Sequence, residues 1–271
     1  MSKFRQAKDC PACKKKKIIS SFLDRHNITY NICFNCKSIY QKEISIKQKH
    51  TNYENFIIDP EGRKRLLKNE KEEKLKNWYG ETINFVNNQN SPGKILDYGA
   101  GLGFFLSGIS KKWKKYAFEV SPTALTFLKK KTNYKVFDNI ASLKKKKSFF
   151  DIIFFYHVIE HLEDPYESLK IIKKLLKKNG ILIVGTPNIN CIAYKIFKKN
   201  FRLLGPGHIF LLNDSSLKKL LSKFGFEVLI MEYPFFKTKY FNLINLFRLF
   251  MPWKISPPFY KSIMTCYAKK K

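Results

Sequence analysis

Short apolar runs alternate with segments of helical periodicity over much of the chain. The runs at 95–98, 150–155 and 181–184 are of strand length and have few polar positions, which is typical of strands buried on both faces. Alternation of this kind predicts an α/β fold built on a doubly wound parallel sheet. Ser91-Pro92-Gly93 marks the start of the pattern, so we expect this domain to cover residues 91–271.

One helix in this pattern carries clear signals at both ends. Asp164 is suited to cap the helix, and Pro165 suits its first turn. Its apolar face consists of Leu169, Ile172 and Leu176. Asn179 and Gly180 favour a left-handed conformation, so we expect the helix to end there, before the strand at 181–184.

The first 36 residues hold four of the six cysteines, in the pattern C-x2-C-x19-C-x2-C. These four are Cys10, Cys13, Cys33 and Cys36. Two knuckles of this spacing can complete a tetrahedral four-thiolate zinc site. The segment between them predicts short strands at 18–22 and 28–32. We therefore expect a small zinc ribbon over residues 1–48, whose closed sulfur shell gives the metal a structural role.

The remaining apolar pattern bears on the cellular compartment. No run approaches the roughly 18 apolar residues of a membrane-spanning helix, and the first residues hold no stretch typical of a secretory signal. We therefore expect a cytoplasmic protein. Disulfides rarely persist there, which argues against the alternative that the two cysteine pairs are oxidised. Cys191 and Cys266 stand alone among apolar residues and are expected in the core.

Residues 49–90 separate the ribbon from the larger domain. The stretch 63–77 is rich in Lys, Glu and Leu and has few turn formers, which predicts a charged helix. We therefore expect these residues to form a helical connector.

A glycine-rich turn follows the first predicted strand. Its glycines, Gly99, Gly101 and Gly103, permit a sharp turn and a close approach of the backbone to a ligand. The dinucleotide fingerprint would require a third glycine at Phe104, so the turn follows a different pattern. Glu119 closes the second predicted strand 22 residues after Asp97, about where doubly wound folds place a ribose-binding carboxylate. Together these residues predict a nucleoside site.

At this point the sequence resembles the class I S-adenosylmethionine (SAM)-dependent methyltransferases, of the methyltransferase type 11/23 branch. The resemblance rests on the stretches 95–103, 150–165 and 180–188 and on Glu119, and it covers roughly residues 91–271. It implies a Rossmann-like seven-stranded sheet whose last strand is antiparallel. The sixth strand would lie at 226–233 and the seventh at 262–268, with the aromatic stretch 240–253 as an insertion between them.

The resemblance also implies how SAM would be held. The three glycines, Gly99, Gly101 and Gly103, would lie beneath its methionine and ribose portions. Asp97 would lie beside the methionine end, and Glu119 would hold the ribose hydroxyls. Asp138, after the predicted third strand, is a further candidate on the adenine side.

Histidines supply the candidate catalytic groups. His157 follows the fourth strand and His208 lies in a Gly-Pro-Gly loop, and we expect both to serve as bases toward the acceptor. His161 is expected to have a structural role. Alternatively, His157, Glu160 and His161 bind a divalent cation, as a similar turn does in ubiquinone-biosynthesis O-methyltransferases. A histidine at 157, where that turn has a glutamate, disfavours magnesium because hard cations prefer oxygen ligands.

The resemblance leads to methyl transfer to a small molecule or sugar, such as a nucleotide-linked or surface-polysaccharide precursor. The alternatives are RNA or ribosomal methylation and a non-catalytic SAM-binding adaptor. The chain has 52 basic and 21 acidic residues, a net charge of +31, which fits a polyanionic partner such as RNA. The lysine runs are scattered, however, which favours compositional bias over a binding stripe.

The insertion at 240–253 is open to two interpretations. Its apolar residues, with a few basic ones nearby, are compatible with peripheral contact with a membrane. A lid over the substrate pocket or a dimer contact is the favoured alternative, because the basic residues are few. The sequence leaves the oligomeric state open.

Overall fold

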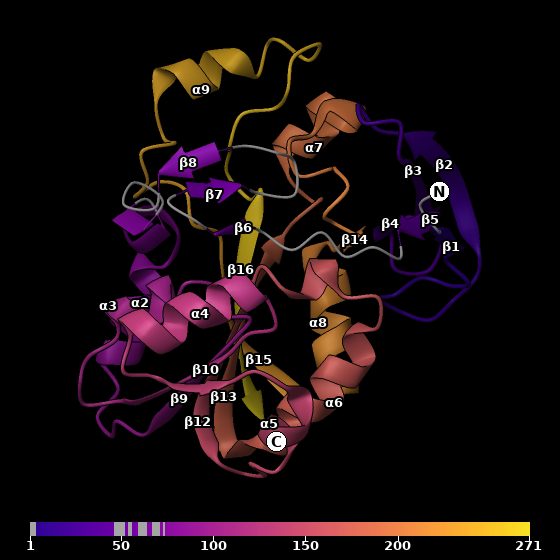
Figure 1. Ribbon diagram of the computed structural model, residues 1–271. Coiled ribbons are helices and arrows are strands. Elements are labelled where there is room, and N and C mark those ends of the chain that lie inside the picture. Colours follow the sequence, from indigo (N-terminus) through magenta and orange to yellow (C-terminus); the bar gives the residue numbers. More distant parts are fainter. Residues whose placement is uncertain (1–3, 46–51, 54–55, 59–63, 67–70, 73) are drawn as a thin grey trace.

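A seven-stranded sheet forms the centre of the structure, and helices cover both of its faces (Figure 1). The computed structural model describes residues 1–271 except 1–3, 46–51, 54–55, 59–63, 67–70 and 73. The strands of the sheet are β9 (Lys94–Tyr98), β10 (Lys114–Phe118), β11 (Lys135–Phe137), β12 (Phe150–Tyr156), β13 (Leu176–Pro187), β15 (Phe226–Glu232) and β16 (Ile263–Lys270). They follow the order β11-β10-β9-β12-β13-β16-β15. Six strands run in one direction and β16 alone runs in the opposite one, so the predicted fold class is confirmed.

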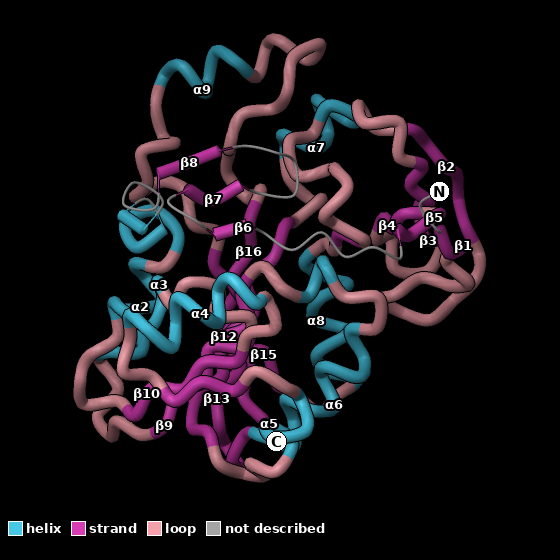
Figure 2. Tube along the Cα trace, viewed as in Figure 1, coloured by secondary structure: helices cyan, strands magenta, loops and turns pink. Residues whose placement is uncertain are grey.

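The helices form two layers, one on each face of the sheet (Figure 2). One layer contains α2 (Gly80–Asn87), α3 (Phe104–Gly108) and α4 (Pro122–Lys131), and the other contains α5 (Ile140–Lys144), α6 (Pro165–Leu175) and α8 (Asp214–Lys223). The Asp164 side chain caps α6 by accepting a hydrogen bond from the Tyr166 amide, as predicted. Cys191 and Cys266 are buried, which confirms their expected core positions.

The predicted end of α6 is wrong. The helix ends at Leu175, and β13 begins at the next residue, where Leu176 pairs with Phe150 of β12. The pairing then resumes at Ile181, so residues 177–180 form an irregularity within the strand. Asn179 has the expected left-handed conformation, with φ +63°, but it lies in a bulge of the strand and not at the end of the helix. Burial of Leu176 against the neighbouring strand outweighs the local turn signal.

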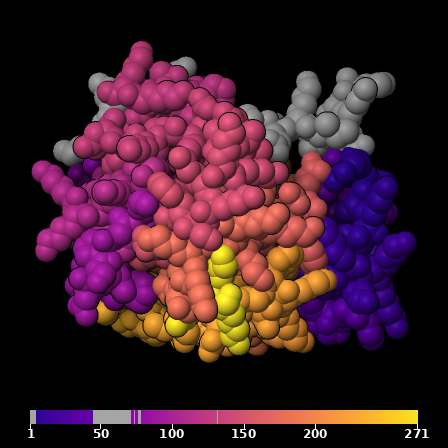
Figure 3. Space-filling view, turned by 90° about the horizontal axis from the view of Figure 1, so that it is seen from below, coloured from indigo at the N-terminus to yellow at the C-terminus, as the bar shows by residue number. Residues whose placement is uncertain are grey.

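The ribbon packs against one side of the main domain, where its residues are drawn in indigo (Figure 3). Its strands β2 (Ile18–Leu23) and β3 (Thr29–Cys33) confirm the two strands predicted between the cysteine pairs, and β4 (Ile39–Gln41) follows the second pair. A short strand that follows β13, β14 (Phe210–Leu211), pairs with β4 and completes a four-stranded sheet. Nearby, β1 (Phe4–Gln6) pairs with β5 (Glu43–Ser45). Main-chain hydrogen bonds therefore join the ribbon to the main domain.

The connector contains strands as well as helix. A small sheet of β6 (Asn52–Tyr53), β7 (Phe56–Ile58) and β8 (Lys64–Leu66) precedes a π-helical turn, η1 (Lys74–Trp78). The prediction of a charged helix over 63–77 is therefore wrong at Lys64–Leu66, which form a strand. Residues 63, 67–70 and 73 lie outside the described residues. Pairing with β7 satisfies backbone groups of β8, whereas a short charged helix without packing is only marginally stable.

Two further segments lie at the carboxyl ends of the parallel strands, at the top of Figure 1. The first is α7 (Ile192–Phe197) with the 3₁₀ turn η3 (Lys198–Asn200), which follow β13. The second is the insertion between β15 and β16, which contains α9 (Leu243–Arg248), so the insertion expected at 240–253 is confirmed. Among the described residues, no helix has the length and apolar character needed to span a bilayer.

Gly185 offers a test of the central packing. A Cβ atom there would lie 2.0 Å from ring atoms of Tyr156, inside the core. We expect Gly185→Ala to lower the free energy of unfolding by about 1–3 kcal/mol, measured by urea denaturation. The matched control is Gly80→Ala, where the nearest atom would lie at 3.5 Å, and there we expect no loss. Equal unfolding midpoints for the two variants would contradict this packing argument.

Candidate active site and metal centre

A cavity of about 210 Å³ lies at the carboxyl ends of β9 and β12. The glycine-rich turn forms one wall, with Gly99, Ala100, Gly101 and Leu102 lining the space. Asp97 from β9 and His157, directly after β12, also line it. The cavity therefore lies where doubly wound sheets bind their ligands.

The glycine turn is held against the end of the neighbouring strand. The backbone N–H groups of Gly99 and Ala100 both donate to the Phe118 carbonyl of β10, at 2.8 and 3.0 Å. Gly99 has φ +90°, and a Cβ atom on it would lie 2.4 Å from Cγ2 of Val158. Any larger residue would therefore be both strained and obstructed here, so the sequence at this position fixes the shape of the cavity wall.

Glu119 is fixed by the same turn. Its Oε2 accepts a hydrogen bond from the Gly101 amide at 2.7 Å, and its Oε1 accepts from the amides of Val120 and Ser121 at 2.7 and 2.8 Å. Since a carboxylate oxygen can accept two hydrogen bonds, Oε2 keeps acceptor capacity for a ligand hydroxyl. Glu119 lies beside the glycine turn and is not one of the residues that line the cavity.

Asp97 is a buried carboxyl group facing the cavity. Burial, together with the negative charge of Glu119, raises its pKa well above the usual range, and Lys74 opposes this shift. A cationic ligand group would compensate for the cost of a charged Asp97 in this position. The acidic pair and the open turn thus fit SAM, which carries a sulfonium and an ammonium charge.

The other predicted cofactor residues lie further out. Gly103 begins α3 with φ +71° and adjoins the cavity without lining it. Asp138 is exposed, and its carboxylate forms an ion pair with Lys129 at 2.8 Å. The structure thus brings Asp97, Gly99 and Gly101 together, and it leaves Asp138 outside the cavity lining.

A buried carboxylate lies behind His157. His157 Nδ1 is 2.9 Å from Oε1 of Glu160, and the Thr186 hydroxyl donates to Oε2 at 3.0 Å. Burial by itself would raise the pKa of Glu160, but the hydrogen bond from His157 and the nearby imidazoles lower it to about 2. The carboxylate is therefore charged, and it orients the His157 ring with Nε2 as the free acceptor.

His161 and His208 form a second group around the same carboxylate. Nδ1 of His161 lies 2.6 Å from the Gly207 carbonyl, and Nδ1 of His208 lies 2.6 Å from the Leu203 carbonyl. Each Nδ1 must therefore carry a proton, because a carbonyl oxygen only accepts hydrogen bonds. Burial and the neighbouring His161 lower the pKa of His208 to about 4. His161 lines the cavity, whereas His208 lies behind it, 4.9 Å away between ring centroids.

Glu160, His161 and His208 place one potential ligand atom each within 4.8 Å of one another, so they could hold a divalent cation. A carboxylate with two neutral imidazoles suits a transition metal better than magnesium. The cation site considered from the sequence differs in one ligand, because the structure groups His208, and not His157, with Glu160 and His161.

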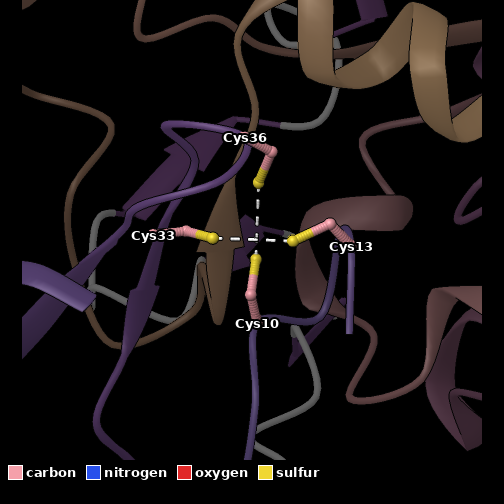
Figure 4. Close-up of side chains that lie close together, drawn as sticks. All are labelled: Cys10, Cys13, Cys33 and Cys36. Atoms are coloured by element: carbon pink, nitrogen blue, oxygen red, sulfur yellow. Dashed lines mark hydrogen bonds between the residues drawn. The ribbon is translucent and has the colours of Figure 1, made fainter. Parts of the chain in front are cut away.

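The four cysteines of the ribbon converge on one point (Figure 4). The Cys10 and Cys36 sulfurs are 3.6 Å apart, and those of Cys13 and Cys33 are 3.5 Å apart. These distances exclude disulfides and are close to the roughly 3.8 Å edge of a tetrahedron with Zn–S bonds of about 2.3 Å. The contact between these two thiols lowers the pKa of Cys36 to about 5 and raises that of Cys10, so Cys36 is the member of the pair that ionises first. The donor set therefore fits Zn²⁺.

The ribbon also holds the loop that carries His208. The Tyr30 hydroxyl donates to the Gly205 carbonyl at 2.9 Å and accepts from the Gly205 amide at 3.1 Å. The Gln41 side chain donates to the carbonyls of Gly205 and His208, at 3.1 and 3.2 Å. Tyr30 and Gln41 were missed from the sequence, because only the fold brings them to this loop.

The connector supplies two further residues that the sequence did not indicate. Lys74 of η1 and Tyr79, directly after it, line the cavity. Tyr79 packs edge-on against the rings of Phe105, Phe154 and Tyr156, at centroid distances of 5.4 to 5.8 Å. The one available signal was the Trp78-Tyr79 pair at the end of an otherwise charged stretch.

Comparison with known proteins agrees with this geometry. The family model for a methyltransferase domain matches residues 69–230. A ubiquinone biosynthesis O-methyltransferase from Pelagibacter ubique (strain HTCC1062) is 35% identical over an alignment of 114 residues, which covers 37% of this chain and 45% of that protein. This chain thus spans less than half the length of that curated relative.

Solved structures share the fold. A SAM-dependent methyltransferase from Thermotoga maritima has a TM-score of 0.53 at 20% identity, over 76% of this chain and 96% of that one. A chain in the complex between the Haloferax volcanii Trm112 methyltransferase activator and a methyltransferase has a TM-score of 0.54 at 10% identity, over 75% and 94% of the two chains.

The chain belongs to the methyltransferase-domain family, since the family model covers more than half of it. Its fold is the one seen in solved SAM-dependent methyltransferases such as the Thermotoga maritima structure. The resemblance that rested on the stretches 95–103, 150–165 and 180–188 and on Glu119 is thereby confirmed at the level of family.

The role of Glu119 can be tested by cofactor binding. Glu119→Gln removes the charge and leaves one of the three backbone donors without an acceptor, so we expect SAM affinity to fall about 10- to 100-fold. Isothermal titration calorimetry with SAM measures the effect. Asp138→Asn is the matched control, since it removes a charge from an exposed ion pair, and we expect less than about a twofold change. An equal loss in both variants would contradict the assignment to Glu119.

Proposed function

We propose that this protein transfers the methyl group of SAM to a hydroxyl group of a small-molecule acceptor, a class that includes sugars. The observation that carries the proposal is the cavity where Asp97 and the glycine turn lie opposite a histidine with a buried carboxylate behind it. The relative from Pelagibacter ubique, an O-methyltransferase, supports an oxygen acceptor.

The residues divide the work between the two sides of the cavity. On one side, Asp97 would accept the cationic methionine portion and Glu119 the ribose hydroxyls, with Gly99 and Gly101 allowing close contact. SAM, when bound, supplies a methyl group already activated by the sulfonium charge. The protein mainly needs to position the acceptor and to exclude water, and this positioning supplies much of the acceleration.

His157 is the proposed base. Its Nε2, which has no hydrogen-bond partner among the described residues, would take the hydroxyl proton as the acceptor oxygen bonds to the methyl carbon and the methyl–sulfur bond breaks. The Glu160 carboxylate at Nδ1 would stabilise the resulting imidazolium. His208 is not among the cavity-lining residues and its Nδ1–H is held by the Leu203 carbonyl, so we propose that it supports the His161 ring and does not act as a base itself.

We also propose that the four cysteines hold a structural Zn²⁺. The closed sulfur shell leaves no ligand position for substrate, so the metal stabilises the ribbon and, through Tyr30 and Gln41, the loop that carries His208.

Acceptor class and base can be tested together. The protein is incubated with methyl-labelled SAM and extracts fractionated into RNA, protein, lipid and sugar-nucleotide pools. We expect label in a small-molecule pool, and we expect His157→Gln to lower the rate about 10²- to 10⁴-fold with SAM affinity retained. His26→Gln, which alters an exposed histidine of the ribbon, serves as the control and should keep the full rate. Label confined to RNA, or an unchanged rate in His157→Gln, would reject the proposal.

Zinc content tests the metal centre. Elemental analysis of the purified protein should give about one zinc per chain, and Cys33→Ser should lose it together with several kcal/mol of stability. We expect amide hydrogen exchange around His208 to accelerate in that variant. Cys266→Ala removes a buried thiol outside the cluster and should retain the metal. Full zinc content in Cys33→Ser would contradict the assignment.

A further inference from the structure

The insertion between β15 and β16 presents large apolar side chains to solvent. Six of them, Phe241, Leu243, Ile244, Phe247, Phe250 and Trp253, are between 61% and 75% exposed, and we refer to them as the apolar face. They lie on α9 and its flanks, at the outer surface in Figures 1 and 2. Soluble proteins rarely expose so many large apolar side chains on one short segment, so the apolar face is expected to have a partner.

The two chain segments that carry and flank the apolar face have basic residues and no acidic ones. Residues 233–271 contain no Asp or Glu, and neither do residues 189–213, which include α7. These two segments meet, because the Asn200 side chain donates to the Pro252 carbonyl at 3.0 Å and the Ser256 amide donates to the Asn200 carbonyl at 3.1 Å. Both segments carry exposed lysines near the apolar side chains, among them Lys198, Lys199 and Lys254. These lysines have no acidic residue within their own segments.

The apolar face adjoins the catalytic cavity. Tyr240, at its edge, packs against Trp78 with ring centroids 5.2 Å apart, and the next residue, Tyr79, lines the cavity. A second cavity of about 450 Å³ lies beneath α9, with walls from Phe235, Leu246 and Phe259. A surface that covered the apolar face would thus lie next to the mouth of the methyl-transfer site.

We propose that the apolar face docks on an anionic lipid bilayer. Aromatic and aliphatic side chains would enter the interfacial region, and the surrounding lysines would contact acidic headgroups. A second copy of this chain fits less well, since two such faces would bring basic segments without acidic residues into contact. The inference goes beyond the proposed function, because it concerns where the enzyme works and not what it methylates.

Vesicle co-sedimentation tests the proposal on the full chain. We expect the protein to pellet with vesicles containing phosphatidylglycerol, with a partition coefficient at least about tenfold higher than on pure phosphatidylcholine. The double variant Phe247→Asp and Phe250→Asp should bind the anionic vesicles at least about tenfold more weakly. Both side chains are exposed, so folding should be retained, and calorimetry with SAM checks this separately from vesicle binding.

The matched control is the double variant Leu229→Asp and Ile230→Asp, which adds the same charges to exposed apolar positions on β15, outside the apolar face. It should pellet like the wild type. Equal binding by the wild type and the Phe247 and Phe250 variant would overturn the proposal. So would equal pelleting on neutral and anionic vesicles, or a dimer in solution that these two substitutions dissociate. SAM binding reports on the methyltransferase function independently of each outcome.

Discussion

Neighbouring parallel strands must end at the same edge of their sheet, and in this protein the ends of β9, β10 and β12 carry polar side chains. Asp97 is paired in register with Ala117 on one side and Phe154 on the other, so the residues that follow those partners reach the same edge. Glu119 and His157 are thereby brought to Asp97, although they lie 22 and 60 residues away in sequence. The cavity follows from this strand register more than from any single loop.

The second requirement is electrostatic, because a charged carboxylate such as Glu160 is costly to bury without partners. The side chain accepts hydrogen bonds from His157 and Thr186, and its backbone carbonyl accepts one from the Ile209 amide at 2.9 Å. These partners come from the end of β12, from β13 and from the His208 loop. The buried charge therefore holds His157 and β13 together and keeps the His157 ring in a defined orientation, while the backbone carbonyl of the same residue holds the His208 loop.

The sequence predicted what local pattern determines. The glycine turn, Asp97 and Glu119 could be identified because the spacing of a strand, turn and helix is nearly fixed, and the cysteine spacing likewise predicted the ribbon. Failures occurred where distant pairing decided the outcome. Leu176 joins a strand because of Phe150, and Lys64–Leu66 pair with β7 despite a composition that favours helix. The contacts of Tyr30 with the His208 loop span 175 residues or more, so no local signal could have indicated them.

These long-range contacts change how the cysteine ribbon should be understood. A ribbon attached only by a linker could stabilise itself without affecting the enzyme. Here β14 pairs with β4, and the backbone N–H of Gln41 donates to the Ile209 carbonyl at 2.8 Å. The Tyr30 hydroxyl is buried against Gly205. The free energy that a metal gives to the ribbon is then also available to order the loop behind His161. A small domain with no open ligand position can in this way contribute to methyl transfer, because it limits the conformations of the residues that face the acceptor.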